Sequence, residues 1–172
     1  DEISLLFHPE VSAFDRKLRK YNSILASEAG AKFSVLLGDV AAFDCRISEL
    51  PSTALVCDYF RWRNEDAHQN ALNAHCYWLL RKQGNNVADA TGFLEDKSVA
   101  EKNELLWQNG TNFNDVPLWQ RRGTGLYWEE YQKHGTNKLT GEETVAMRRR
   151  IKVDYELPMR DAFTGFIKDF LV

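Results

Sequence analysis

A pair of carboxylates opens this sequence in a position suited to phosphate chemistry. Asp1 and Glu2 stand at the mouth of an expected strand, Ile3–Phe7, where a carboxylate is held rigidly and still reaches solvent. Mg²⁺ prefers a few hard oxygen ligands together with water and substrate phosphates, and two such ions catalyse phosphoryl transfer. The pair is therefore a candidate for metal binding and catalysis. Two solvated charges are the ordinary alternative.

Three cations follow on an expected helix, Phe14–Leu37. Arg16, Lys17 and Lys20 fall on adjacent turns of this helix, so their side chains are expected to converge on one polyphosphate. A solvated helix face explains the same spacing equally well.

A second group of cations lies in the expected strand Val145–Tyr155. Arg148, Arg150 and Lys152 recur at period two, which places them on one face of a strand. Aligned like charges repel unless an anion or carboxylates answer them. The pattern predicts contact with RNA or a triphosphate, and a surface ion-pair ladder is the alternative.

His68 and His75 share one face of the longest expected helix, Ala54–Lys82. No third zinc ligand stands nearby in sequence, so we expect His75 to be a packed histidine. We also expect four tryptophans to lie in the core rather than to stack on bases: Trp62, Trp78, Trp107 and Trp128.

Bulk properties limit the classes of protein. A chain of 172 residues, 44% hydrophobic, can enclose one substantial core, so residues 1–172 are expected to form a single domain. A net charge of -3 argues against a uniformly basic nucleic-acid surface. No apolar run approaches the roughly 20 residues that cross a bilayer, and no leader opens the chain. Cys45, Cys57 and Cys76 fit reduced, mostly buried thiols, so we expect a soluble, cytoplasmic protein.

Strands and helices alternate along the chain and end in a hairpin-like return. This order predicts an α+β fold with helices on one face of a mostly antiparallel sheet. Besides the segments already given, the expected elements are a strand at Phe43–Leu50, helices at Val87–Leu94, Ser98–Gln108 and Ala162–Leu171, a loop at Asn109–Pro117, and a strand at Gly125–Tyr131 that is followed by a turn at Gly135–Gly141.

Residues 62–72 read WRNEDAHQNAL, and Trp78 follows them. This run resembles the helix of tRNA-histidine guanylyltransferases, with its WRxxDxHxNxL pattern and a following Trp. Further matches occur in order: residues 1–4 resemble the family's SDE-x-S strand, residues 43–46 its FDxRV strand, residues 102–106 its KNEILF helix and residues 112–114 its NYN loop. The common order makes chance similarity improbable.

The resemblance implies a palm-like (ferredoxin-like) fold similar to that of ordinary polymerases. It also implies two-metal chemistry with Mg²⁺, in which ATP activates the tRNA 5′-monophosphate and a nucleotide such as GTP is then joined to it. Growth runs in the 3′–5′ sense. By this resemblance Asp1 bridges the metals and Glu2 supports the site.

The same resemblance assigns further roles. Lys17 and Lys20 match the family's KRRxxK stretch and contact a triphosphate beside Arg16, and Asn70 is assigned to the nucleotide. The family places tRNA contacts, near the anticodon, at three positions that correspond to His68, Lys102 and Asn112. Family members are often tetramers, so a homo-tetramer is expected.

The sequence departs from the family at two points. The RxDGRxF strand with the other metal-binding aspartate would lie upstream of Asp1, so we expect this sequence to be part of a longer protein. Ala71 replaces the second Asn of the eukaryotic HINNLYN pattern, and residues 148–158 look more like bacterial and archaeal Thg-like proteins, which repair 5′-truncated tRNAs. We predict template-dependent tRNA 5′-end repair; a non-catalytic tRNA-binding module and a palm-like nucleotide cyclase are the alternatives.

Overall fold

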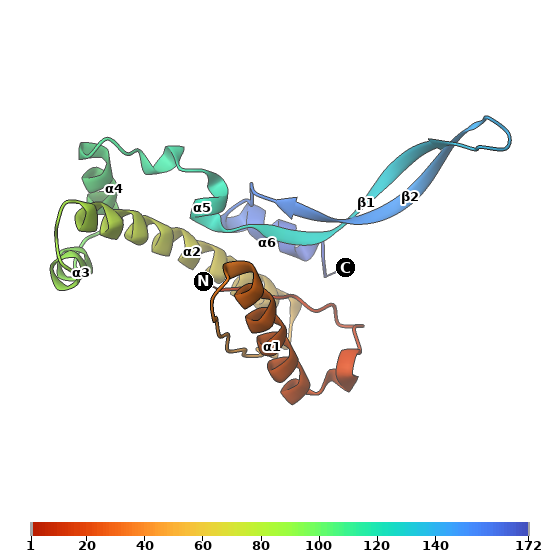
Figure 1. Ribbon diagram of the computed structural model, residues 1–172, viewed down its shortest axis with the longest axis horizontal. Helices are drawn as coiled ribbons and strands as arrows, with labels where there is room; N and C mark the ends of the chain where they lie inside the picture. Colours follow the sequence, from red (N-terminus) through yellow and green to blue (C-terminus); the bar gives the residue numbers. More distant parts are fainter. Residues whose placement is uncertain (1, 172) are drawn as a thin grey trace. The chain divides into compact units, whose positions relative to one another are not determined.

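The computed structural model describes residues 2–171, which fall into two compact units (Figure 1). Unit 1 comprises residues up to 58 together with those from 167 onward, and unit 2 comprises Tyr59–Phe166. The division falls within the helices α2 (Thr53–Lys82) and α6 (Arg160–Lys168). No helix of the described part is long and apolar enough to span a membrane.

Unit 1 is built on α1 (Leu18–Leu37), which ends at Gly38 in the left-handed conformation, φ 75°. The helix begins later than Phe14, where we expected it to start, because the short 3-10 turn η1 (Ala13–Arg16) precedes it. Phe14 has a positive φ of 55°, which an α-helix does not accept. Its ring packs edge-on against buried Tyr21 instead, 5.6 Å between centroids.

Two segments that we expected as strands are not strands. Ile3–Phe7 and Phe43–Leu50 form no ladder with any part of the chain that the structure describes, and a strand exists only through such hydrogen bonds. The second segment is held against α1 by other means. Phe43 packs edge-on against Phe33, with 5.6 Å between ring centroids, and the Ala41 N–H donates to Ser34 Oγ at 2.9 Å.

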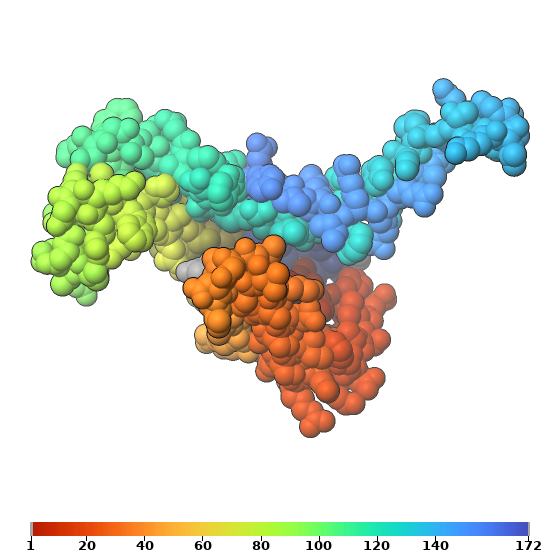
Figure 2. Space-filling view, viewed as in Figure 1, coloured from red at the N-terminus to blue at the C-terminus, as the bar shows by residue number. Residues whose placement is uncertain are grey.

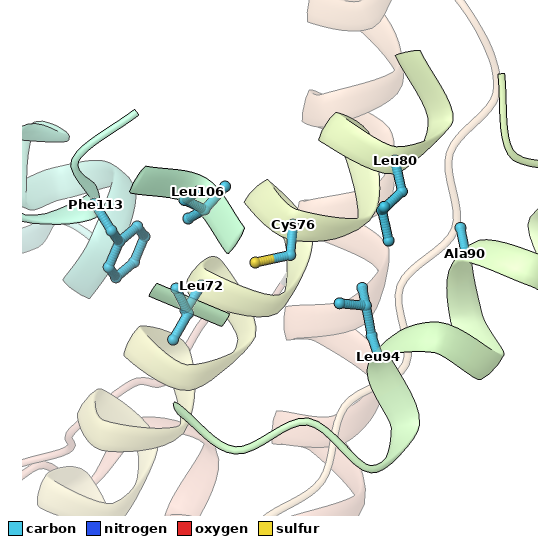
Figure 3. Packing of buried hydrophobic residues seen from close by; sticks show 7 residues of the cluster. All are labelled: Leu72, Cys76, Leu80, Ala90, Leu94, Leu106 and Phe113. Atoms are coloured by element: carbon cyan, nitrogen blue, oxygen red, sulfur yellow. The ribbon is translucent and has the colours of Figure 1, made fainter. Parts of the chain in front are cut away.

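The helices of unit 2 follow the expected boundaries closely. Helix α2 begins after Ser52, whose Oγ accepts the Leu55 N–H at 3.3 Å, and it is followed by α3 (Val87–Glu95) and α4 (Val99–Gln108). One face of α2 supplies Leu72, Cys76 and Leu80 to a buried cluster (Figure 3). Its other buried members are Ala90, Leu94, Leu106 and Phe113.

A long antiparallel hairpin completes unit 2. Strand β1 (Gly125–Thr136) pairs with β2 (Glu143–Asp154) from Gly125↔Asp154 to Thr136↔Glu143. At its base Tyr127 packs against Phe166 of α6, 5.3 Å between ring centroids. Residues 132–147 are all exposed, and the far end of the hairpin extends away from the helices of its unit (Figure 1).

The expected mixture of helices with an antiparallel sheet is therefore confirmed at the level of a two-stranded sheet. Within the described residues the sheet has no further strands, and the palm-like fold stays a prediction. The final helix starts earlier than Ala162, at Arg160. The expected loop at residues 109–117 contains the 3-10 turn η2 (Phe113–Asp115), and it is followed by α5 (Leu118–Arg122), a helix that we did not expect.

The four tryptophans that we assigned to the core are exposed, so that expectation was wrong. On α2 the face with Leu72 and Cys76 makes the packing contacts, and Trp62 and Trp78 occupy other positions of the helix. Their exposed fractions are 56% for Trp62, 60% for Trp78, 64% for Trp107 and 60% for Trp128. The cysteines agree with expectation: all are free thiols, with Cys57 and Cys76 buried and Cys45 half-buried.

Candidate nucleic-acid interface

The candidate metal ligand Asp1 lies outside the described residues, so its role stays a prediction. Glu2 is exposed at the start of an extended segment of unit 1. Across residues 2–171, no three His, Cys, Asp or Glu side chains gather closely enough to hold a metal ion. Nothing in the described part therefore assembles the site that the carboxylates predict.

The three N-terminal cations do not line one helix as expected. Arg16 lies in η1, and its Nη1 donates to the carbonyls of Pro9 and Val11, both at 2.8 Å. Its guanidinium is thus used to fold the loop before α1. Lys17 stands at the N-cap of α1 with Nζ 3.1 Å from the Asp15 carboxylate.

Lys20 lies in the first turn of α1 and is exposed, as Arg16 and Lys17 are. It forms no ion pair with any described residue. Of the residues proposed for the triphosphate in unit 1, Lys20 is therefore the most available to an anion.

Asn70 is exposed on α2 within a short polar chain. Its Nδ2 donates to Asp66 Oδ2 at 3.1 Å, and the same carboxylate lies 3.4 Å from Arg63 Nη1. The Arg63 guanidinium in turn lies 4.6 Å from the centroid of the Trp62 ring. The amide oxygen of Asn70 remains available to a ligand, and its nucleotide role stays a prediction.

His68 and His75 both pack on Phe113, which explains their spacing of two helical turns. Their ring centroids lie 5.4 Å and 5.6 Å from that of Phe113. His75 is a packed histidine, as expected. His68 Nδ1 is buried without a hydrogen-bond partner. Burial first, and then the charges of Arg121 and Arg122, lower the pKa of His68, so the ring is held neutral.

Asn112 caps the η2 turn, and its Oδ1 accepts the Asn114 N–H at 3.1 Å. The side-chain oxygen is thus engaged by its own loop, and the Nδ2 donor of Asn112 has no hydrogen-bond partner among the described residues. The loop is anchored by Phe113, of which only 3% is exposed.

Lys102 lies on α4, where its carbonyl accepts the Cys76 Sγ–H at 3.3 Å. Burial raises the pKa of that thiol. The side chain of Lys102 lines a cavity of about 240 Å³ together with Asn73, Tyr77, Thr91, Leu94 and Glu95. His68, Lys102 and Asn112 therefore all border the same buried cluster, through Phe113 and Cys76.

The sequence reasoning missed Arg121, a 7%-exposed arginine on α5. Its Nε and Nη2 donate to the carbonyls of Val116 and Asn114, at 2.8 and 3.0 Å. A signal was present, because Pro117 immediately before the helix and Gly123 immediately after it mark the limits of a short helix.

The hairpin brings Arg148, Arg150 and Lys152 to one face, as their period predicted. Opposite them on β1 stand Tyr131, Glu129 and Tyr127, respectively.

Carboxylates form ion pairs with two of these three cations. Arg150 Nη2 lies 2.7 Å from Glu129 Oε2, and Lys152 Nζ lies 3.8 Å from both Glu129 and Asp154. Tyr127 first, with help from both carboxylates, raises the pKa of Lys152. Arg148 is exposed and forms no ion pair within residues 2–171. The face is thus part ion-pair ladder and part open cationic site.

These features define an α+β protein. Exposed cations lie on helix α1 and on the β1–β2 hairpin, where they are accessible to an anionic ligand. Residues 54–160 match the family described as the Thg1 C terminal domain. The chain belongs to this family, the Thg1 or tRNA(His) guanylyltransferase family, as its sequence motifs implied.

Individual relatives agree. The probable tRNA(His) guanylyltransferase of Mus musculus is 28% identical over 170 residues, which are 89% of this chain and 57% of the relative. That of Drosophila melanogaster is 32% identical over 136 residues, 73% of this chain and 48% of the relative. The chain therefore spans about half the length of these curated relatives.

A solved structure is similar as well. It is a bacterial tRNA(His) guanylyltransferase (Thg1)-like protein in complex with GTP, 30% identical, with a TM-score of 0.58. The likeness covers 91% of this chain and 57% of that protein.

Proposed function

We propose that this chain is part of a nucleotidyltransferase that adds nucleotides to the 5′ end of tRNA in the 3′–5′ sense. The observation that carries the proposal is the likeness to a bacterial Thg1-like protein solved with GTP, which covers 91% of this chain. In the proposal residues 1–172 act as one domain with a palm-like fold, GTP and ATP are substrates, and the protein is cytoplasmic.

Mg²⁺ belongs to the proposal through the family alone. Residues 2–171 by themselves do not fit a two-ion site, because no three potential ligands gather among them. When bound, the ions would activate the attacking hydroxyl and neutralise phosphate charge. We propose that Asp1, with Glu2 in support, joins carboxylates from outside the described residues.

The tRNA contacts are proposed on two surfaces. On the helical cluster, the Asn112 amide donor has no partner among the described residues, and Lys102 lines a cavity. On the hairpin, Arg148 is exposed opposite Tyr131, whose ring lies against the Arg150 guanidinium at 4.8 Å, so Arg148 is proposed to contact phosphate. Arg150 and Lys152 join this surface when phosphates replace their carboxylate partners.

His68 acts in this proposal chiefly as a support for the Asn112 loop. Its ring is half-buried against Phe113, and its unpartnered Nδ1 is buried too. Lys20, with Lys17, is proposed to hold the triphosphate, and Asn70 to contact the nucleotide.

The proposed substrate range is broad, with repair of several 5′-truncated tRNAs. Ala71, which replaces a family Asn, packs against the buried cluster. An alanine methyl neither donates nor accepts a hydrogen bond, so this position cannot read a base edge. Pairing with the opposite strand of the acceptor stem would then select the added nucleotide.

The assembly is proposed to be a homo-tetramer. The outward face of the hairpin carries apolar side chains that are unusually exposed, among them Leu126 at 67% and Trp128 at 60%. Light scattering of the complete protein tests the tetramer, and a monomer would contradict it.

The activity is tested with the complete protein and tRNAs that lack their first nucleotide. Single-turnover addition of labelled nucleotide should proceed on truncated histidine tRNA and on two truncated tRNAs with other anticodons. Asp1→Asn should abolish addition while it leaves tRNA affinity intact. Binding without addition would favour a non-catalytic tRNA-binding module, and formation of a cyclic nucleotide would favour a cyclase. A preference for the histidine anticodon of about a hundredfold would contradict the repair proposal.

A further inference from the structure

Arg121 of α5 binds the loop that precedes its own helix. Its Nε donates to the Val116 carbonyl at 2.8 Å, and its Nη2 donates to the Asn114 carbonyl at 3.0 Å. One planar guanidinium thus joins two points of the same short turn. Only 7% of the arginine is exposed, so these bonds are made away from water and constrain the turn more strongly than surface bonds would.

The loop is held from its other side by an aromatic contact. Phe113 is 3% exposed, and the Arg121 guanidinium carbon lies 5.7 Å from the centroid of its ring. From α2, His68 and His75 contact the same ring. Figure 3 shows Phe113 beside Leu106 and Leu72 at the edge of the buried cluster. The turn is therefore fixed between α2 and α5.

Asn112 is the residue whose position these contacts fix. Its carbonyl accepts the Asp115 N–H at 3.0 Å, and its Oδ1 accepts the Asn114 N–H at 3.1 Å. Both bonds depend on the positions of residues 114 and 115, and Arg121 fixes residue 114 through its carbonyl. The direction of the Asn112 amide donor is thus set by a side chain that itself is buried.

We propose that Arg121 is a positioning residue for tRNA binding, which holds the Asn112–Val116 turn so that the Asn112 amide faces the RNA. This inference rests on the proposed function, because it needs Asn112 to contact tRNA. Lysine cannot replace the arginine here, since a single ammonium lacks the planar fork that reaches two carbonyls while it lies over a ring.

The test is a double-mutant cycle on tRNA affinity in the complete protein, measured by filter binding. Asn112→Ala and Arg121→Lys are each expected to weaken tRNA binding by about fivefold, an effect of the size of one lost hydrogen bond. The double variant should be no weaker than Asn112→Ala alone, because Arg121 acts through Asn112. GTP affinity should be unchanged in all three.

The matched control is Arg122→Lys. Arg122 is the next residue of the same helix, and its Nη1 donates to the Leu157 carbonyl at 3.0 Å, away from the turn. This variant should bind tRNA like the unaltered protein. Hydrogen exchange gives a second measurement: Arg121→Lys should speed exchange of the Asp115 and Val116 amides and leave the β1 amides unaffected.

The outcomes separate the inference from the function on which it rests. An unchanged affinity in Asn112→Ala would remove Asn112 from the tRNA site and overturn the function proposed for it. A weakened Asn112→Ala with normal binding in Arg121→Lys, or with losses that add in the double variant, would overturn the positioning role alone. If Arg121→Lys does not fold, the same cycle is run with Arg121→Gln, for which additive losses or unchanged 112–116 exchange would equally overturn it.

Discussion

Arg150 donates from Nε to Oε2 of Glu129 across the β1–β2 ladder, with 2.7 Å between the two atoms. The Glu129 carboxylate is thus paired with Arg150, one of the cations that we propose to bind tRNA. Glu129→Gln should release it, so tRNA affinity should rise about threefold and the salt dependence of binding should steepen by about one phosphate contact. Binding measured across a salt series checks this.

Glu130→Gln provides the control for the hairpin. Glu130 lies on the opposite face, 4.0 Å from Arg149 Nε, and its loss changes the net charge by the same amount. Equal gains in the two variants would mean that net charge alone matters. A loss of affinity in Glu129→Gln would show that the ion pairs hold the hairpin in its binding form.

His68 should make the stability of the protein depend on pH. Burial, Arg121 and Arg122 lower its pKa below the ordinary value of 6.5, so the unfolded state binds more protons than the folded state when the pH falls. The contribution of His68 to the free energy of unfolding is therefore complete above about pH 6.5, and it declines as the pH falls from there toward the pKa of the folded state. Urea unfolding at pH 7.5 and pH 5.5 measures the loss.

The matched variant for this effect is His68→Asn, in which the difference between the two pH values should shrink. His75→Asn serves as the control, because His75 contacts the same ring. If the pH dependence persists in His68→Asn but disappears in His75→Asn, the prediction for His68 is contradicted.

The helices were the part of the fold that the sequence predicted well. Ser52 and Ser98 cap α2 and α4, and a cap acts through hydrogen bonds within a few residues of itself. The strands at Ile3–Phe7 and Phe43–Leu50 were wrong for the opposite reason. Alternation of apolar residues shows that a segment buries one face, but the partner that would make it a strand lies elsewhere in the sequence.

In the candidate site, too, the sequence predicted local relations correctly and did not predict contacts between distant residues. Period two placed Arg148, Arg150 and Lys152 on one face because that relation is local. Arg16 was misplaced because α1 begins at Leu18 and not at Phe14; Arg16 therefore lies in η1, and its guanidinium donates to the Pro9 carbonyl. Arg121 was missed because its role consists of bonds to carbonyls, and any residue supplies a carbonyl.

The capping box of α4 makes a local prediction. Ser98 Oγ accepts the Glu101 N–H at 3.3 Å, and Glu101 Oε2 accepts the Ser98 N–H at 2.8 Å. Ser98→Ala should lower the free energy of unfolding by about 1 kcal/mol. Ser23→Ala on the surface of α1 is the control and should change it by less than about 0.5 kcal/mol. Equal effects in urea unfolding would contradict a special role of the cap.

Glu101 adds a pH dependence to the same cap. The backbone N–H of Ser98 first, then Lys97 and the Ser98 hydroxyl, lower the pKa of Glu101 from 4.5 to about 2. Its contribution is therefore present above pH 4.5 and is lost as the pH falls toward about 2. NMR titration of the Glu101 carboxylate should show the low pKa, and Ser98→Ala should raise it.

The rings of Phe113 and Trp107 should contribute unequally to the free energy of unfolding. Phe113 is 3% exposed within the buried cluster, whereas Trp107 is 64% exposed on α4. Phe113→Ala should therefore lower the free energy of unfolding by about 3 to 5 kcal/mol, and Trp107→Ala should change it by less than about 0.5 kcal/mol. A large loss in Trp107→Ala would mean that this ring is covered in the assembled protein, as the tetramer would allow.

Lys20 and Lys17 should contribute unequally to nucleotide addition. Lys17 is engaged by Asp15 at 3.1 Å, whereas Lys20 has no ion pair among the described residues, so Lys20 is more available to a triphosphate. Lys20→Ala should slow addition to a 5′-monophosphate tRNA about tenfold and addition to a pre-activated 5′-triphosphate tRNA much less, because only the first substrate needs ATP. Lys17→Ala should have a smaller effect of the same kind. Arg19→Ala, between them on the chain, is the control, and equal losses on both tRNAs in Lys20→Ala would indicate general RNA binding.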